Sequence, residues 1–212
     1  MSEGYKILSL DELGAYASPN HGDSRLMPLR RRLGLRAFGA NCWTAEVGKR
    51  VVPEHEEDSG NEELYVVVRG RATFTVDGET IEAPAGTLLF VQAGERRTAV
   101  AEEPDTVVLA VGATVGEPFV SHGWDDVVVA FNMAQAGEVD AGRAIMQTTA
   151  ENGWEGSYNL ACFEARFGDL DAAFDSLRRV VDAAPDVVAP YLEHDSDLDR
   201  LREDPRWQEL TR

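Results

Sequence analysis

Cysteine is scarce in this sequence. The 212 residues include two cysteines, Cys42 and Cys162, which lie far apart in the chain. Small secreted domains that depend on disulfides carry several cysteines at close spacing. We therefore expect no disulfide framework, and a reducing compartment is expected.

Positive charge is also scarce. The chain has 20 Lys and Arg residues against 38 Asp and Glu residues, so its formal net charge is -18 and its pI is near 4.5. Nucleic acids and anionic membrane surfaces repel such a chain, and we expect neither as a partner. A solvated acidic surface that keeps the protein soluble accounts for the charge.

Long apolar runs are missing as well. No stretch of the sequence approaches the roughly 18 apolar residues of a membrane span. Residues 1–16 have neither the cationic start nor the apolar run of a secretory signal. We therefore expect a cytoplasmic protein.

The first half of the chain consists of short runs rich in β-branched and aromatic residues, separated by turn residues. One short helical turn is expected at residues 11–13. Strands are expected at residues 5–8, 35–45, 63–68, 72–76, 79–83, 87–92, 97–101 and 106–111. Asp77-Gly78 predicts a hairpin turn between two of them. Turn signals every 8–12 residues or so are typical of a β-sandwich or barrel.

Acidic side chains and one histidine gather in residues 48–70, GKRVVPEHEEDSGNEELYVVVRG. Residues 63–68 alternate in the manner of a strand, and a polar loop precedes them. The stretch therefore delivers several polar side chains to one end of a β-sheet. These are His55, Glu57, Asn61 and Glu63. Whatever chemistry the protein has is expected to start there.

The spacing in this stretch resembles the first signature of the cupin superfamily. That signature reads glycine, five residues, His-x-His, three or four residues, Glu, six residues, Gly, and residues 63–70 fit its ending. A second signature follows from Gly86. In it Gln92, Arg97 and Ala101 stand where cupins have Pro, His and Asn. The resemblance implies a jelly roll, which agrees with the number of expected strands.

The resemblance also implies a metal site made of three imidazoles and one carboxylate, a set that suits divalent iron, manganese, nickel or zinc. In this sequence the candidate ligands are His55, Glu57 and Glu63. Arg97 stands in a histidine position, and a guanidinium has no lone pair to donate and stays cationic. We therefore expect no cofactor, with a divalent metal as the alternative.

Two interpretations of the jelly-roll interior are open. In the first, Arg97, with help from Arg96, holds the carboxylate or phosphate of a small molecule in a pocket. The other candidate ligand-binding residues are Glu63, His55, Tyr65, Asn61 and Trp43, with Phe90 as a further apolar wall. In the second, Arg97 and Glu63 pair inside a closed sandwich, where desolvation offsets much of their attraction.

The pattern changes after Gly116, because alanine becomes common and apolar residues recur at helical spacing. Residues 136–141 and 167–172 look like copies of one another. Residues 158–185 resemble a tetratricopeptide repeat, with Gly168-Asp169 at the turn and Pro185 at the end. The first copy departs from the repeat at Gly142, where a small alanine is usual. About three such repeats are usually needed for a stable helical domain, and this chain has two. We therefore expect the repeats to pack against the sandwich or against a second copy of the protein.

The expected fold is α+β, with a cupin-like β jelly roll over residues 1–117 and a tetratricopeptide-like helical domain over residues 118–212. The leading function is binding or sensing of a small molecule without the usual metal. Alternatives are a metal-dependent enzyme of the dioxygenase or isomerase type, and an adaptor that binds a protein partner through the helices. Both faces of residues 63–68 are apolar, so a homodimer is expected. The remaining histidines, His21, His122 and His194, are expected at the surface.

Overall fold

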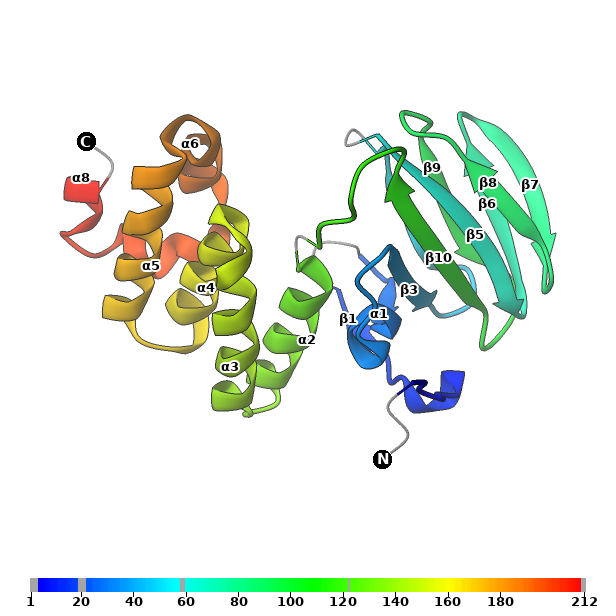
Figure 1. Cartoon of the computed structure of the whole chain (residues 1–212), viewed down its shortest axis with the longest axis horizontal. Helices are drawn as coiled ribbons and strands as arrows, with labels where there is room; N and C mark the ends of the chain where they lie inside the picture. Colours follow the sequence, from blue (N-terminus) through cyan, green and yellow to red (C-terminus); the bar gives the residue numbers. More distant parts are fainter. Residues whose placement is uncertain (1–3, 19–21, 58–59, 122, 211–212) are drawn as a thin grey trace. The chain divides into compact units, whose positions relative to one another are not determined.

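The structure of the protein is a computed structural model that describes residues 4–18, 22–57, 60–121 and 123–210 (Figure 1). The chain forms two compact units, Met1–Ser121 and His122–Arg212. The first is built from strands and the second from helices. This confirms the α+β class expected from the sequence. Within the described ranges, no helix has the length and apolar character needed to cross a membrane.

The first unit contains two antiparallel sheets, one with the order β1-β2-β3-β10-β5-β8 and one with the order β4-β9-β6-β7. The strands are β1 Tyr16–Ala17, β2 Arg25–Met27, β3 Gly39–Thr44, β4 Arg50–His55, β5 Asn61–Arg69, β6 Arg71–Val76, β7 Glu79–Pro84, β8 Leu88–Val91, β9 Arg97–Ala101 and β10 Val107–Thr114. Two short helices, η1 Leu10–Glu12 and α1 Leu29–Leu33, accompany them. The rings of Tyr65 on β5 and Phe74 on β6 lie 5.5 Å apart, so the two sheets pack face to face. These are the jelly-roll sheets that the sequence predicts.

Most of the expected strands are present with small shifts at their ends, and β9 has the bounds predicted for it. The expected turn at Asp77-Gly78 joins β6 to β7, and both residues have positive φ (45° and 86°), as a type I′ hairpin requires. The chain passes from β5 to β6 at Gly70, where φ is 71°. A Cβ atom there would lie 2.9 Å from the Cα atom of Thr106, so only glycine fits at this crossing.

One expected strand is absent, and the strands β1, β2 and β4 were not expected. Residues 5–8 form no strand: Tyr5 and Ile7 are 69% and 87% exposed, and Leu8 alone of the three apolar side chains packs against a core cluster. Conversely, β4 was not predicted, because Pro53 interrupts its pattern. This strand lies at the edge of its sheet, where the missing N–H of a proline breaks no ladder.

The two faces of β5 have different surroundings. Tyr65 and Val67 point into the sandwich and are each 1% exposed. The outward face continues onto β8, where Leu88 and Phe90 are 67% and 55% exposed. The expectation that Phe90 walls an internal pocket is therefore wrong, because its register with Leu64 turns it outward. The homodimer that would cover this face stays a prediction.

The second unit is a row of antiparallel helices in which α2 packs on α3, α3 on α4 and α4 on α5 (Figure 1). Its elements are α2 Trp124–Gln135, α3 Val139–Thr149, η3 Ala150–Asn152, α4 Trp154–Phe167, α5 Leu170–Ala183, α6 Pro185–His194, η4 Ser196–Leu198, α7 Asp199–Arg202 and α8 Trp207–Leu210. The carboxylate of Asp169 accepts hydrogen bonds from the backbone N–H groups of Asp171 and Ala172 and so caps α5. The helical character is confirmed, and the assignment to the tetratricopeptide class stays a prediction.

Close packing explains why the first helical copy carries glycine at position 142. A Cβ atom at Gly142 would lie 2.6 Å from the carbonyl oxygen of Ala130 and 3.0 Å from the ring of Phe163. Glycine therefore lets α3 approach both α2 and α4. The departure from the repeat pattern reflects a tight contact between three helices.

Candidate functional site

The residues of the stretch 48–70 meet at the end of the sandwich where β4 ends and β5 begins. His55 is the last residue of β4, and its register partner Arg97 is the first residue of the neighbouring strand β9. Glu63 and Tyr65 lie on β5, in the facing sheet. Strand alternation turns Glu63 and Tyr65 to the same inner face. We call these four side chains the Glu63 cluster.

The carboxylate of Glu63 is the centre of this cluster. Its Oε2 atom lies 3.3 Å from Nε2 of His55 and 3.4 Å from Nε of Arg97, and it accepts a short hydrogen bond from the hydroxyl of Tyr65. Burial raises the pKa of Glu63, but the hydrogen bonds from His55 and Tyr65 outweigh it and hold the pKa below its usual value. Burial raises the pKa of Tyr65 far above its usual value, so this phenol stays a donor.

The orientation of the His55 ring is set by the backbone. Its Nδ1 atom lies 2.8 Å from the carbonyl oxygen of Pro53, which assigns the hydrogen to Nδ1. Its Nε2 atom then faces two carboxylates, Glu63 at 3.3 Å and Glu57 at 3.7 Å. Burial lowers the pKa of His55, but the hydrogen bonds with Glu63 and Pro53 outweigh it, so the net shift is upward.

Arg97 is fully buried, with 0% of its side chain exposed. Its Nη2 atom donates to the carbonyl oxygen of Gln92 at 3.2 Å. Its Nε and Nη1 atoms have no hydrogen-bond partner among the residues that the structure describes. Glu63 is close enough to Nε to attract it, but it lies outside hydrogen-bond geometry. Buried donors without a partner are rare in folded proteins and call for an explanation.

Asn61 and Glu57 extend the polar groups beyond the Glu63 cluster. The amide of Asn61 donates to Glu57 at 3.2 Å, and the hydroxyl of Thr114 donates to Asn61 at 2.6 Å. Thr114 was not predicted from the sequence. It joins the site because β10 places it opposite Asn61 in the sheet. The connection between Glu57 and Asn61 passes through Asp58 and Ser59, which lie outside the described residues.

The structure does not bring Trp43 to the site. Trp43 is buried on β3 and pairs in register with Val108. The β3 residue level with Glu63 is Gly39, because both pair with Gly112 of β10. Trp43 lies four residues further along β3, a rise of about 13 Å. It therefore packs deeper in the sandwich.

The other candidates from the sequence lie outside this cluster. Arg96 is exposed and forms ion pairs with Glu54 and Glu56 at 3.0 Å and 2.8 Å. His194 is exposed at the end of α6, as expected. His21 and His122, which were also expected at the surface, lie outside the described residues.

His55, Glu57 and Glu63 form a possible metal-binding group, because one donor atom from each lies within 4.8 Å of the others. The carbonyl of Pro53 orients the imidazole in the manner of an outer-shell ligand, which favours such a site. Arg97 opposes it, because a permanent positive charge lies 3.4 Å from the Glu63 oxygen that would bind the metal. The donors fit a weak, oxygen-rich cation site better than a tight transition-metal centre.

Replacing His55 with Gln is expected to cost more stability near pH 5.5 than near pH 8.5. The raised pKa of His55 stabilises the fold below the ordinary value of 6.5, and this contribution is lost as pH rises through the folded pKa. The lowered pKa of Glu63 stabilises the fold above its ordinary value of 4.5, and this contribution is lost as pH falls through the folded pKa. Both contributions are therefore present between about pH 4.5 and 6.5.

Urea unfolding of wild type and His55→Gln at the two pH values measures this difference. His194→Gln is the matched control, since His194 is exposed. An equal cost at both pH values would show that the charge on His55 does not stabilise the cluster, despite the Glu57 and Glu63 carboxylates and the Arg97 guanidinium that surround it.

Comparison with known proteins identifies the first unit. Residues 42–112 match the family model described as Cupin domain. An uncharacterized protein of Streptomyces coelicolor is 32% identical over 89 residues, which cover 42% of this chain and 77% of that protein.

Three solved structures are also similar to this chain. The first is a cupin protein of Bacteroides fragilis (22% identity, 56% of this chain and 92% of that chain, TM-score 0.42). The second is KdgF of Halomonas sp. (18% identity, 50% and 93%, TM-score 0.42). The third is a predicted oxalate decarboxylase of Thermotoga maritima (19% identity, 52% and 100%, TM-score 0.44).

Proposed function

Because the first unit of this chain belongs to the cupin superfamily, we propose that it binds a small anionic molecule in the sandwich through Arg97. One observation carries this proposal: Nε and Nη1 of a fully buried arginine lack a hydrogen-bond partner in the part of the chain that the structure describes. An unpaired buried polar group costs about 1–3 kcal/mol, and more when it is charged. A carboxylate or phosphate from a ligand would satisfy these donors, since guanidinium groups match such anions in geometry and charge.

The route to Arg97 passes Glu63. Arg97 has no exposed surface, whereas the side chains of Glu63 and His55 are 15% and 31% exposed. An incoming anion therefore has to move the Glu63 carboxylate, which sits near Nε without forming a hydrogen bond to it. The same carboxylate oxygen also contacts His55 and Tyr65. Glu63 thus lies where the anion would bind and competes with it.

Malonate and inorganic phosphate are the probes for this function. We expect one or both to raise the unfolding temperature of wild type and of Arg96→Met, but not of Arg97→Met. The control is matched, because Arg96 is the adjacent arginine and pairs with exposed acids at the surface. Equal shifts in Arg96→Met and Arg97→Met would contradict the proposal, and so would the absence of a shift in wild type.

Glu63→Gln is expected to bind the same probe about tenfold more tightly than wild type, because the competing charge is removed. If Arg97→Met folds poorly, the double variant Glu63→Gln/Arg97→Met removes both charges together and so avoids a lone buried carboxylate. This variant should fold and should not bind. Calorimetric titration of the three variants compares their affinities directly.

The second candidate function, a metal-dependent enzyme, is favoured by the proximity of His55, Glu57 and Glu63. Elemental analysis after dialysis separates it from the first. We expect clearly less than one equivalent of iron, manganese, nickel or zinc, because Arg97 repels the cation. Arg97→His adds one imidazole and should raise metal content slightly at most. A stoichiometric metal in wild type that survives dialysis, and is lost in His55→Ala, would favour the enzyme instead.

A further inference from the structure

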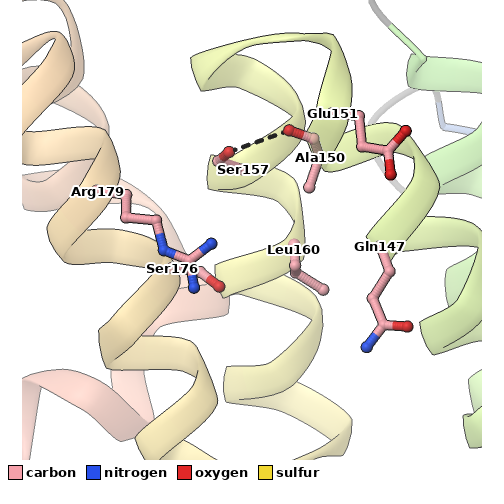
Figure 2. A pocket seen from close by; sticks show the side chains of 7 residues that line it. All are labelled: Gln147, Ala150, Glu151, Ser157, Leu160, Ser176 and Arg179. Carbon is pink, nitrogen blue, oxygen red and sulfur yellow. Dashed lines mark hydrogen bonds between the residues drawn. The ribbon is translucent and has the colours of Figure 1, made fainter.

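The helical unit contains a groove of about 300 Å³ that the proposed function does not use (Figure 2). Side chains from α3, η3, α4 and α5 line it, and all of them belong to one compact unit. Its volume is at the lower end of the range for small-molecule sites. The residues that matter for its chemistry are Gln147, Glu151, Ser157, Leu160, Ser176 and Arg179.

Ser176 is the most informative of these residues. It lies in the middle of α5 and is 5% exposed. Its hydroxyl points into the groove (Figure 2) and forms no hydrogen bond with any described residue. A serine or threonine inside a helix can bond back to the carbonyl four residues earlier, as Thr149 does to Ile145. Because this hydroxyl opens on the groove, a ligand there can use it as both a donor and an acceptor.

Arg179 adds a positive charge beside this hydroxyl. It lies one turn after Ser176 on the same helix, so both side chains reach the same groove. Among the described residues it pairs with no carboxylate, whereas its neighbour Arg178 lies 3.8 Å from Asp175. A hydroxyl and a guanidinium together form a donor pair suited to a carboxylate.

The opposite side of the groove offers acceptors. The hydroxyl of Ser157 donates to the carbonyl oxygen of Ala150 at 3.3 Å, so its lone pairs are left to accept. Glu151 brings a carboxylate to this side, across the groove from Arg179 (Figure 2). Leu160 lies between the two sides and supplies an apolar wall.

We propose that this groove is a second ligand site, which takes a small zwitterion of the aliphatic α-amino-acid class. Its carboxylate would bind Arg179 and Ser176, its ammonium group would face Glu151 and Ser157, and its side chain would lie against Leu160. A zwitterion adds no net charge to a chain whose formal charge is -18, so it approaches without the repulsion that a dicarboxylate would meet.

The probes for this site are L-leucine and two analogues that each lack one charged group. 4-Methylpentanoate keeps the carboxylate and the apolar chain, and 3-methylbutylamine keeps the amine. Calorimetric titration of the full chain should show L-leucine binding, with each analogue weaker by at least about tenfold. An analogue that binds as tightly as L-leucine would overturn the assignment to a zwitterion.

Three variants test whether L-leucine binds in the groove. Arg179→Met and Ser176→Ala are expected to weaken L-leucine binding by about tenfold or more, and Arg178→Met should leave it unchanged. Ser176→Ala should keep or raise the unfolding temperature without ligand, because no hydrogen bond to a described residue is lost and alanine has the higher helix propensity. Loss of binding in this variant would therefore not reflect misfolding.

Absence of L-leucine binding at millimolar concentration would overturn the proposal. So would equal affinities in wild type, Arg179→Met and Ser176→Ala. The anion probes of Arg97 test a different unit, so either proposal can fail without the other.

Discussion

Replacing Arg97 with alanine is expected to lower the free energy of unfolding of the first unit by about 3–5 kcal/mol. The substitution leaves the largely buried carboxylate of Glu63 without its cationic neighbour and opens a cavity where a large side chain was fully enclosed. Urea unfolding at neutral pH measures this loss. The pKa of Glu63 should rise at the same time, since it loses an attraction to the guanidinium.

Two further variants separate charge from volume. Arg96→Ala should change the stability by less than about 0.5 kcal/mol, because its ion pairs are exposed. The double variant Glu63→Gln/Arg97→Met should recover much of the loss, because it removes both buried charges and fills the space. If Arg97→Ala is as stable as Arg96→Ala, then Arg97 is not held by the packing seen here.

Replacing Phe163 with alanine should lower the stability of the helical unit by about 3–5 kcal/mol. Phe163 is 0% exposed, and its ring packs edge-on against Phe131 at 5.6 Å and beside Phe167 at 5.4 Å. It also fills the space that Gly142 leaves between three helices. The loss of this side chain therefore loosens α2, α3 and α4 together.

Hydrogen exchange read by mass spectrometry can follow each unit separately. Exchange in α2 to α5 should accelerate strongly in Phe163→Ala, whereas β5 and β9 should stay protected. Val187→Ala is the control, since Val187 belongs to the same unit but is 51% exposed. Equal acceleration in the strands would show that the two units unfold as one, contrary to their division into two compact bodies.

Local patterns in the sequence determined most of the secondary structure. The alternation of residues 63–68, the Asp77-Gly78 pair and the helical spacing after Trp124 each act over a few residues. Side-chain period and turn conformation are local properties, so they can be recognised without knowing the fold. The cupin signature is of the same kind, because its positions, which hold Glu63 and Arg97 in this chain, lie at fixed distances from glycines.

Positions that depend on neighbouring strands were not determined in this way. Pro53 interrupts the strand pattern of β4, so the sequence does not predict this strand. β4 can contain a proline because it lies at the edge of its sheet. Phe90 faces outward and Trp43 lies deep in the sandwich because of their pairing with Leu64 and Val108. A strand register is set by contacts between segments, which a single segment does not encode.

The sequence by itself determined which residue types stand at the site. The tertiary structure alone decided which side chains they contact and how deeply they are buried. Glu63 approaches His55 and Arg97 because two sheets pack face to face. Nε and Nη1 of Arg97 are buried without a hydrogen-bond partner among the described residues, and this too follows from the packing of distant segments around them. A motif sets the chemistry of a side chain, whereas its burial and its partners depend on how the whole chain fills space.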